Sequence, residues 1–522
     1  MGGSLADQRR ADRYFKRVLI DGLELQPSQR IETDIAIIGS GPAGMTLAIT
    51  LAEAGREVTV IESGGLERDD AISALNEATS SGINYPLAPT RVRKLGGSSD
   101  HWTGICRPLD PWDFSVRDWV PHSGWPLDWD DLADNFASAQ TWLELGPNRY
   151  DWESWNADLG PDEMGVDQGL MVPRLVQVSA PTRFGDAYRK RLVDNPNATV
   201  ILQSTVTDIV LTSPGQSVER LAVSTLAGNS FDVVAKRYVL AAGGIENARL
   251  LLASSSVMTA GVGNQNDLVG RYFMDHPHVY QSGTLLLSRT EAQVAPYLGV
   301  VPASRKDDTG PSGKPQPSLV AAALALPDDL QAQVRCLGGT LALTRPAGSA
   351  ESTQPDTWPP FRTDGLTAAG PAQFLAEDTH VYQLVIRTEQ APNPDNRVTL
   401  NTQKDALGVP TADLAWNIGD LEKRTFDTLF TTLAQATGIA AIGRTNEDVD
   451  ARGMVTGGPH HMGTTKMASS ASDGVVDSDC KVFDVDNLWI AGSSVFPTSG
   501  WANPTLTLVA LADRLAHHLL AL

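Results

Sequence analysis

The chain has 522 residues, of which 42% are hydrophobic and 20% charged, and this balance excludes a wholly disordered or fibrous protein. Its formal net charge of −21 repels phosphate backbones and anionic lipid headgroups, so nucleic acids and membrane surfaces are disfavoured as partners. Three widely spaced cysteines form no CxxC pair, which disfavours both a disulfide framework and a zinc site. We expect a globular protein of a reducing compartment.

The sequence shows no pattern of export or membrane insertion. Arg9-Arg10 could suggest a twin-arginine signal, but no apolar stretch follows. The longest uninterrupted apolar run, 319–326, has eight residues, far fewer than the ~20 that a spanning helix needs. These features predict a cytoplasmic protein.

Residues 31–62 carry the sharpest local pattern. A short apolar run at 34–38 predicts a buried parallel strand, and 45–54 favours a helix. A second strand is predicted at 57–61 and ends at Glu62. A glycine turn separates the first strand from the helix, and this order and spacing are typical of a dinucleotide-binding βαβ unit.

The glycines of the turn have separate physical roles in such a unit. Gly39 permits the tight turn, Gly41 lets the backbone approach a pyrophosphate, and Gly44 permits close packing of the helix on the strand. The helix N-terminus offers free N–H donors and a positive dipole end to the phosphates. Glu62 can accept both hydroxyls of an adenosine ribose. The unit alone does not distinguish FAD from NAD.

A second glycine pair lies in the segment 95–104. Paired glycines let the backbone lie against a flat ligand, and short hydroxyl side chains beside them can donate hydrogen bonds. The residues that could face a ligand are Gly96, Gly97, Ser98, His101, Trp102 and Thr103. The alternative is a surface loop in which His101 is only hydrogen-bonded and Trp102 packs.

The centre of the chain has a different texture. Residues 102–155 contain eight of the twelve tryptophans and several prolines, which favours an irregular packing excursion over a regular sheet. The segments 302–318 and 347–371 are rich in Pro, Gly, Ser, Thr and Asp and are typical of long loops or lids. Strand-forming runs occupy 199–202, 205–211, 231–234 and 238–240, and the last leads into the glycine pair Gly243-Gly244.

The last part of the chain is again glycine-rich and ends in an apolar helical run at 505–520. His460-His461-Met-Gly-Thr is followed 43 residues after its first histidine by Asn503. A histidine with a near-neutral pKa is the natural general base for an alcohol. Metal ligation is disfavoured, because adjacent side chains diverge and no further ligand is spaced nearby. A structural polar core is the other alternative.

Together these patterns predict an α/β fold. The blocks 31–275 and 455–522 are expected to form one Rossmann-like nucleotide-binding domain built from both chain ends. The block 276–454 is expected to form an inserted, β-sheet-based substrate domain. The tryptophan-rich excursion belongs to the first block.

The motifs resemble the glucose–methanol–choline (GMC) family of flavin oxidoreductases. The most specific are H-x-x-G-T at His460, Asn-Leu-Trp-Ile-Ala-Gly-Ser-Ser at 487–494, and Asn-Pro-Thr-Leu-Thr at 503–507. The segment 270–277, Gly-Arg-Tyr-Phe-Met-Asp-His-Pro, also matches the family. The resemblance implies a Rossmann-like FAD-binding domain with FAD as the cofactor.

The same resemblance assigns roles to residues. It implies that His460 and Asn503 form the catalytic pair and that His461 is a structural neighbour, although a register error of one residue would exchange the two histidines. It implies no metal. The implied FAD contacts are Gly39, Gly41, Pro42, Ala43, Gly44, Glu62, Gly96, Gly97, Ser98, His101, Trp102, Thr103, Val206, Ala242, Gly243, Gly492, Ser493, Asn503, Pro504 and Thr505.

Within the family, the segment 96–103 is similar to one in the pyranose 2-oxidases in which a histidine is joined covalently to the flavin. His101 takes that position, and Thr103 takes that of a threonine near flavin N5. Bacterial sugar and C-glycoside 3-oxidases also resemble this chain. Some sugar oxidoreductases of this branch hold FAD without a covalent bond, so both forms of attachment are open.

The implied reaction is oxidation of an alcohol to a carbonyl. Neutral His460 would accept the hydroxyl proton, Asn503 would orient the oxygen, and hydride would pass to flavin N5. We expect a secondary hydroxyl of a sugar or glycoside as the substrate and O₂ as the acceptor. The rate should fall at low pH, around the reference histidine pKa of ~6.5. Alternatives are a dehydrogenase with a quinone or protein acceptor and a non-catalytic flavin-binding protein.

Overall fold

The fold is taken from a computed structural model that describes residues 19–162, 164–303, 318–345, 379–448 and 454–522. The expected loops at 302–318 and 347–371 lie almost entirely outside these residues, and so does the N-terminal segment with Arg9-Arg10. Among the helices that the structure describes, none has the length and apolar character needed to cross a bilayer.

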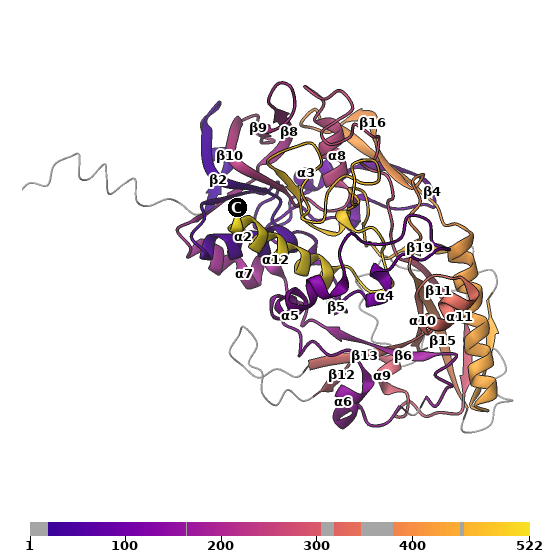
Figure 1. The fold of residues 1–522 in the computed structure, drawn as a ribbon. Helices are drawn as coiled ribbons and strands as arrows, with labels where there is room; N and C mark the ends of the chain where they lie inside the picture. The colour runs from indigo at the N-terminus through magenta and orange to yellow at the C-terminus, as the bar shows by residue number, and fades with distance from the viewer. Residues whose placement is uncertain (1–18, 163, 304–317, 346–378, 449–453) are drawn as a thin grey trace, which may run out of the picture.

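The first sheet joins segments from the beginning and the end of the chain (Figure 1). Its core strands are parallel and fully buried near their carboxyl ends, as a doubly covered sheet requires. In spatial order the strands are β1 (Leu19–Asp21), β7 (Ala198–Leu202), β3 (Val58–Ile61), β2 (Arg30–Ile38), β10 (Ser230–Leu240), β9 (Val218–Ser224) and β8 (Thr205–Leu211), with β20 (Leu488–Ile490) also on β10. β10 is one continuous strand where the sequence predicted two runs.

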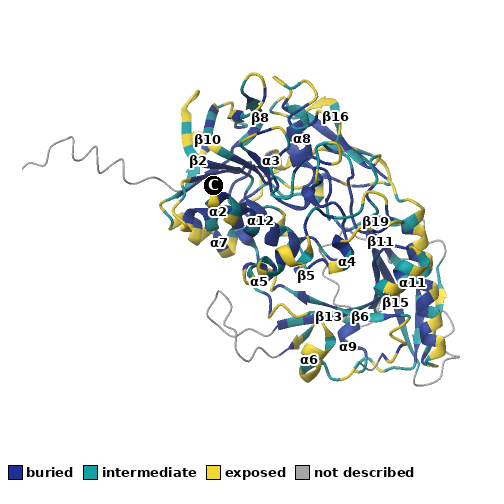
Figure 2. Cartoon of the chain, in the orientation of Figure 1, coloured by how far each residue is buried: buried dark blue, intermediate teal, exposed yellow. Residues whose placement is uncertain are grey.

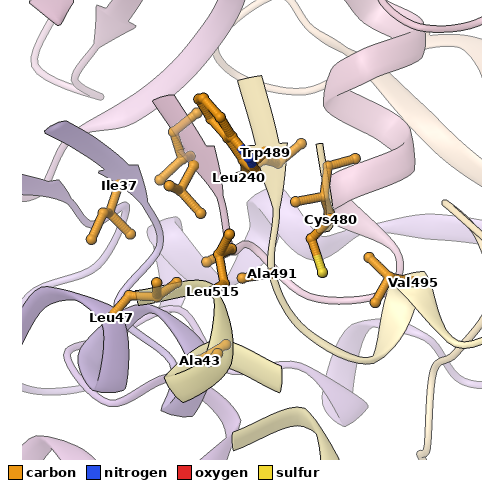
Figure 3. Close-up of a cluster of buried hydrophobic side chains, with 14 of the residues drawn as sticks. Ile37, Ala43, Leu47, Leu240, Cys480, Trp489, Ala491, Val495 and Leu515 are labelled. Atoms are coloured by element: carbon orange, nitrogen blue, oxygen red, sulfur yellow. The ribbon is translucent and has the colours of Figure 1, made fainter. Parts of the chain in front are cut away.

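Three helices lie together beside β2 and β10: α2 (Pro42–Glu53), α7 (Phe184–Val193) and α12 (Thr505–Ala521) (Figure 1). α12 packs against α2, so the last helix of the chain covers the first nucleotide-binding helix. Figure 3 shows how Leu47 of α2 and Leu515 of α12 meet Ile37, Leu240 and Ala491 at the ends of the strands. This core makes the C-terminal segment part of the same domain.

The second sheet is antiparallel and forms its own core with helix α11 (Asp420–Ile439). Its buried side chains alternate along β13, as expected for a sheet with one face on a core. In order, its strands are β18 (Gly443–Glu447), β11 (Pro277–Leu287), β15 (His380–Thr388), β14 (Gly339–Thr344), β13 (Ser318–Ala325), β6 (Val172–Val178) and β5 (Ile105–Cys106), with β19 (Val455–Gly457) on β11 and β12 (Val301–Ala303) on β13. Figure 2 shows that the outward side of α11 is exposed while the strands beneath it are buried.

A three-stranded sheet links the two parts of the molecule. It consists of β16 (Arg397–Lys404), β17 (Pro410–Trp416) and β4 (Ala78–Gly82), and β17 pairs with β4 in parallel. β4 belongs to the predicted N-terminal block and β17 to the predicted insert, while β5 and β6 of the N-terminal block join the second sheet. The exact domain boundaries therefore stay a prediction.

The α/β fold class is confirmed: a Rossmann-like domain built from both chain ends carries an inserted domain based on a β-sheet. The tryptophan-rich excursion contains short helices and only one short strand, β5. The remaining helices are α3 (Asp70–Ser73), α4 (Pro111–Phe114), α5 (Ala133–Trp142), α6 (Trp152–Leu159), α8 (Glu246–Ala253), α9 (Ala295–Leu298) and α10 (Asp328–Val334).

Candidate active site

Three parallel strands end side by side, and each leads into a glycine turn. Ile38 of β2 pairs with Leu240 of β10, which pairs with Ile490 of β20. The turns that follow contain Gly39, Gly243 and Gly492. The carboxyl edge of an open parallel sheet is the usual position of a bound nucleotide, so the glycine motifs meet where a cofactor would lie.

The space around these glycines fits a cofactor. A Cβ atom added to Gly41, Gly243 or Gly492 would meet no atom within 4 Å. A Cβ atom on Gly44, in contrast, would lie 2.1 Å from the carbonyl oxygen of Gly39. Gly44 is thus required for packing of helix on strand, whereas the other three keep space open. Helix α2 also begins without a side-chain cap, which leaves its first N–H groups for a ligand.

Glu62 lies buried at the end of β3, as predicted for the acid of the unit. Its Oε2 accepts hydrogen bonds from Ser40 N at 3.0 Å and Ser40 Oγ at 2.6 Å, and its Oε1 accepts one from Gly64 N at 2.8 Å. Burial raises the pKa of this carboxyl group against the lowering effect of those bonds. A carboxylate has about four acceptor positions, and three of those on Glu62 are already occupied. The remaining position can accept one ribose hydroxyl.

The second glycine block lies directly on the nucleotide turn. Gly96 N donates to Ser40 O at 3.1 Å, and a Cβ on Gly97 would lie 2.9 Å from Gly41 Cα. Trp102 packs, and its Nε1 donates to a backbone carbonyl at 3.0 Å. His101 is exposed and its ring makes no hydrogen bond to the described residues. The covalent bond between His101 and FAD stays a prediction.

Ser98 and Thr103 are exposed beside His101. Val206 lies apart from the glycine turns, on β8, where it is buried. Its neighbour Thr205 shares a hydrogen bond of 2.8 Å with Ser63, the residue after Glu62. Val206 therefore lies near the carboxyl end of β3, where Glu62 is located.

The third and fourth motifs are joined by buried hydrogen bonds. Asn247 accepts from Ala242 N at 2.8 Å and donates to Ser494 Oγ at 2.9 Å. Thr464 Oγ1 donates to Gly244 O at 2.5 Å, and Ser493 Oγ donates to the backbone carbonyl of His461 at 2.7 Å. These bonds fix the histidine pair against the glycine-lined edge.

The two histidines face different surroundings. His460 shares an Nδ1–Nδ1 hydrogen bond of 2.8 Å with His276, and its ring also lies 6.3 Å from that of His278. His461 Nε2 is 3.0 Å from the hydroxyl of Tyr85, and its ring packs 6.0 Å from that of Phe273. The expected divergence of neighbouring side chains places His460 against the second sheet and His461 in an aromatic cluster.

The electrostatic surroundings keep both histidines neutral. Withdrawal of the ring from water lowers the pKa of His460 well below its usual value, and the neighbouring His276 and His278 lower it further. Burial lowers the pKa of His461 to about 3. Neutral His460 can accept a proton at physiological pH. The fall in rate should therefore come at a lower pH than the reference value suggested.

Asn503 lies in the turn that leads into α12 and is partly buried. Its amide makes no hydrogen bond to the described residues, so it keeps its donors for a ligand. α12 begins at Thr505 behind Pro504, and its N-terminus has no side-chain cap. A second positive helix end therefore reaches the site region.

Sequence reasoning missed the residues that hold the histidine loop. Asp275 Oδ1 accepts hydrogen bonds from the backbone N–H groups of His276, Gly458 and His460 at 2.6, 3.0 and 3.0 Å. Its Oδ2 accepts from the Tyr85 hydroxyl at 2.5 Å. Asp275 and His276 lie within the segment 270–277, which matched the family but carried no assigned role.

A parallel sheet with a glycine turn after its first strand and a buried acid after its second defines a dinucleotide-binding protein. A family profile described as FAD dependent oxidoreductase matches residues 34–348, and one described as GMC oxidoreductase matches residues 392–512. The chain belongs to the GMC family of FAD-dependent oxidoreductases, and FAD is its cofactor.

Similar proteins extend over nearly the whole chain. A 2-methyl-1,2-propanediol dehydrogenase of Mycolicibacterium austroafricanum is 25% identical and covers 92% of this chain and 94% of its own. A C-glycoside 3-oxidase of Microbacterium trichothecenolyticum is 24% identical and covers 94% and 96%. The solved structure of pyridoxine 4-oxidase from Mesorbium loti has a TM-score of 0.53 at 19% identity and covers 94% and 99%, which shows a shared fold.

Replacing Gly41 by valine should give a folded protein that loses FAD, because the new side chain enters open space where the pyrophosphate would lie. Flavin absorbance per chain after purification measures the loss, and circular dichroism checks the fold. Gly438→Val is the matched control, since a Cβ there also meets no atom within 4 Å but lies on α11. Gly44→Val should fail to fold. Full FAD retention in Gly41→Val would contradict this assignment.

Proposed function

We propose that the protein oxidises a secondary hydroxyl of a sugar or glycoside to a ketone, with His460 as the base and O₂ as the electron acceptor. The observation that supports this most is the neutral His460, which has one ring nitrogen engaged and the other free of hydrogen bonds to the described residues. The similar C-glycoside 3-oxidase supports the substrate class. The similarity of segment 96–103 to the pyranose 2-oxidases also supports a sugar as the substrate.

Each residue of the pair has a defined task in this reaction. Neutral His460 accepts the hydroxyl proton, and Asn503 donates a hydrogen bond that orients the same oxygen. When bound, FAD supplies the redox chemistry by accepting hydride from the carbinol carbon. After proton transfer, His460 is positively charged and favours negative charge on the neighbouring oxygen.

A second candidate is a dehydrogenase that passes electrons to a quinone or to a protein. The similar 2-methyl-1,2-propanediol dehydrogenase favours it. The His460–Asn503 chemistry is the same in both cases, and only the oxidative half-reaction differs. A flavin-binding protein without turnover would have no need of a neutral histidine and a free amide together.

We also propose a cytoplasmic location. Cys106, Cys336 and Cys480 are all free thiols and buried, which suits a reducing compartment.

The substrate class can be tested by anaerobic bleaching of the flavin. Free sugars, O-glycosides, C-glycosides and simple diols are added to the holoenzyme without oxygen, and air is then admitted. A sugar or glycoside should bleach the visible flavin absorbance in less than a second if it is reduced near the median enzyme rate of ~10 s⁻¹. Rapid recovery in air indicates an oxidase. Bleaching by diols alone would contradict the proposal, and slow recovery that a quinone accelerates would favour the dehydrogenase.

His460→Ala should slow flavin reduction by at least the ~10² that general base catalysis typically supplies, with FAD still bound. Asn503→Ala should cost less, because it removes an orienting hydrogen bond and leaves the proton acceptor. His461→Ala should lower the melting temperature more than the rate, since its ring fills an aromatic cluster. Stopped-flow reduction separates these effects. If His460→Ala reduces its flavin at the wild-type rate while His461→Ala reduces it slowly, His461 is the base and His460 the structural neighbour.

The rate of flavin reduction should stay constant as the pH falls through 6.5 and decline only below it. Only neutral imidazole accepts the proton, and the lowered pKa keeps His460 neutral to lower pH. Besides the neighbouring histidines, Arg387 lowers this pKa. Burial raises the pKa of Asp275 to about 6, so its protonation also falls below 6.5 and does not move the expected decline upward. A midpoint above 6.5 would contradict the assignment.

A further inference from the structure

His276 lies between the candidate base and the segment that carries Asn503. Its ring is buried, with 1% of its surface exposed, and stands nearly perpendicular to that of His460 at a centroid distance of 4.8 Å. Its Nδ1 is 2.8 Å from His460 Nδ1, and its Nε2 is 2.9 Å from the carbonyl oxygen of Gly500. Both nitrogens of this ring are therefore engaged, one on each side of the site.

The position of each proton follows from the acceptors. A carbonyl oxygen can only accept a hydrogen bond, so His276 must carry its proton on Nε2. Burial lowers the pKa of His276 to about 4, so at neutral pH the ring has one proton and Nδ1 holds a lone pair. The Nδ1–Nδ1 contact then requires a proton on His460 Nδ1. The remaining nitrogen of His460, Nε2, is left with a lone pair.

We propose that His276 is a positioning residue that fixes the tautomer of His460, so that Nε2 is the proton acceptor, and that it ties this base to the Gly500–Asn503 turn. The role rests on the proposed function of His460. His276 itself does not touch the reacting atoms. Its effect passes through the shared hydrogen bond.

The backbone around His276 makes this arrangement rigid. Asp275 Oδ1 accepts from the N–H groups of both His276 and His460, so the two rings approach each other from residues held by one carboxylate. Gln390 accepts from Asp275 N at 2.9 Å, and its own N–H donates to Ser499 Oγ at 3.0 Å. The partners of the Nε2 donor and of the Nδ1 acceptor of His276 are thus both held in place by neighbouring chain segments.

A neutral imidazole differs from the carboxylate that orients the base histidine in Ser-His-Asp sites. Both accept from Nδ1–H and select the tautomer. A carboxylate would also raise the pKa of the base by its charge, whereas His276 lowers that pKa. The charged and titratable groups that face the His276 ring are Glu389, Arg387, His278 and His460. The base is oriented here without being made more basic.

Nitrogen NMR of the wild-type holoenzyme with ¹⁵N-labelled histidine tests the tautomers directly. His460, assigned by the loss of its signals in His460→Gln, should show a protonated Nδ1 and an unprotonated Nε2. His276, assigned likewise in His276→Asn, should show the reverse, with a coupling between the two Nδ1 nuclei through the hydrogen bond. A proton on His460 Nε2 would overturn the inference. Because no substrate is present, this result is independent of whether any sugar is oxidised.

Two variants of one residue test the consequence for the rate. His276→Phe keeps a flat ring but removes the acceptor, and flavin reduction should slow at least ~10-fold, a part of the ~10²–10⁴ of general base catalysis. His276→Asn keeps an acceptor near the Nδ1 position and should recover most of the rate. Substrate affinity should change little in either. Equal losses in both variants at unchanged flavin content would overturn the role, because a structural effect would not follow the acceptor.

Discussion

The buried carboxylate of Asp275 is the contact on which the site depends. It binds backbone N–H groups from two segments that are about 180 residues apart in the chain, and the Tyr85 hydroxyl completes its shell. An unpaired charge in this position would be costly, so the four donors must be present together. The histidine loop, β11 and the N-terminal domain are thereby held in one arrangement.

The local chemistry of the cofactor edge could be predicted from the sequence because it depends on short-range rules. A glycine that allows close packing, such as Gly44, and one that leaves space, such as Gly41, occupy fixed positions in a turn between a strand and a helix. The family and the fold class followed from several such motifs together. The structure then separated the two glycine roles by distance.

The partners of His460 could not be predicted in the same way. Its contact with His276 depends on the pairing of β19 with β11, which brings residues 455–457 beside 277–279. No spacing rule links such distant segments. The same limit applies to the second sheet, where β5 pairs with β6 and β6 pairs with β13, a strand much later in the chain.

The position of β20 in the first sheet has a consequence for biosynthesis. β20 and α12 complete the nucleotide-binding sheet and its cover, yet they leave the ribosome after the whole second sheet has been made. The carboxyl end of β10 must therefore wait with an open edge, and α2 with an uncovered face, until these segments have been made.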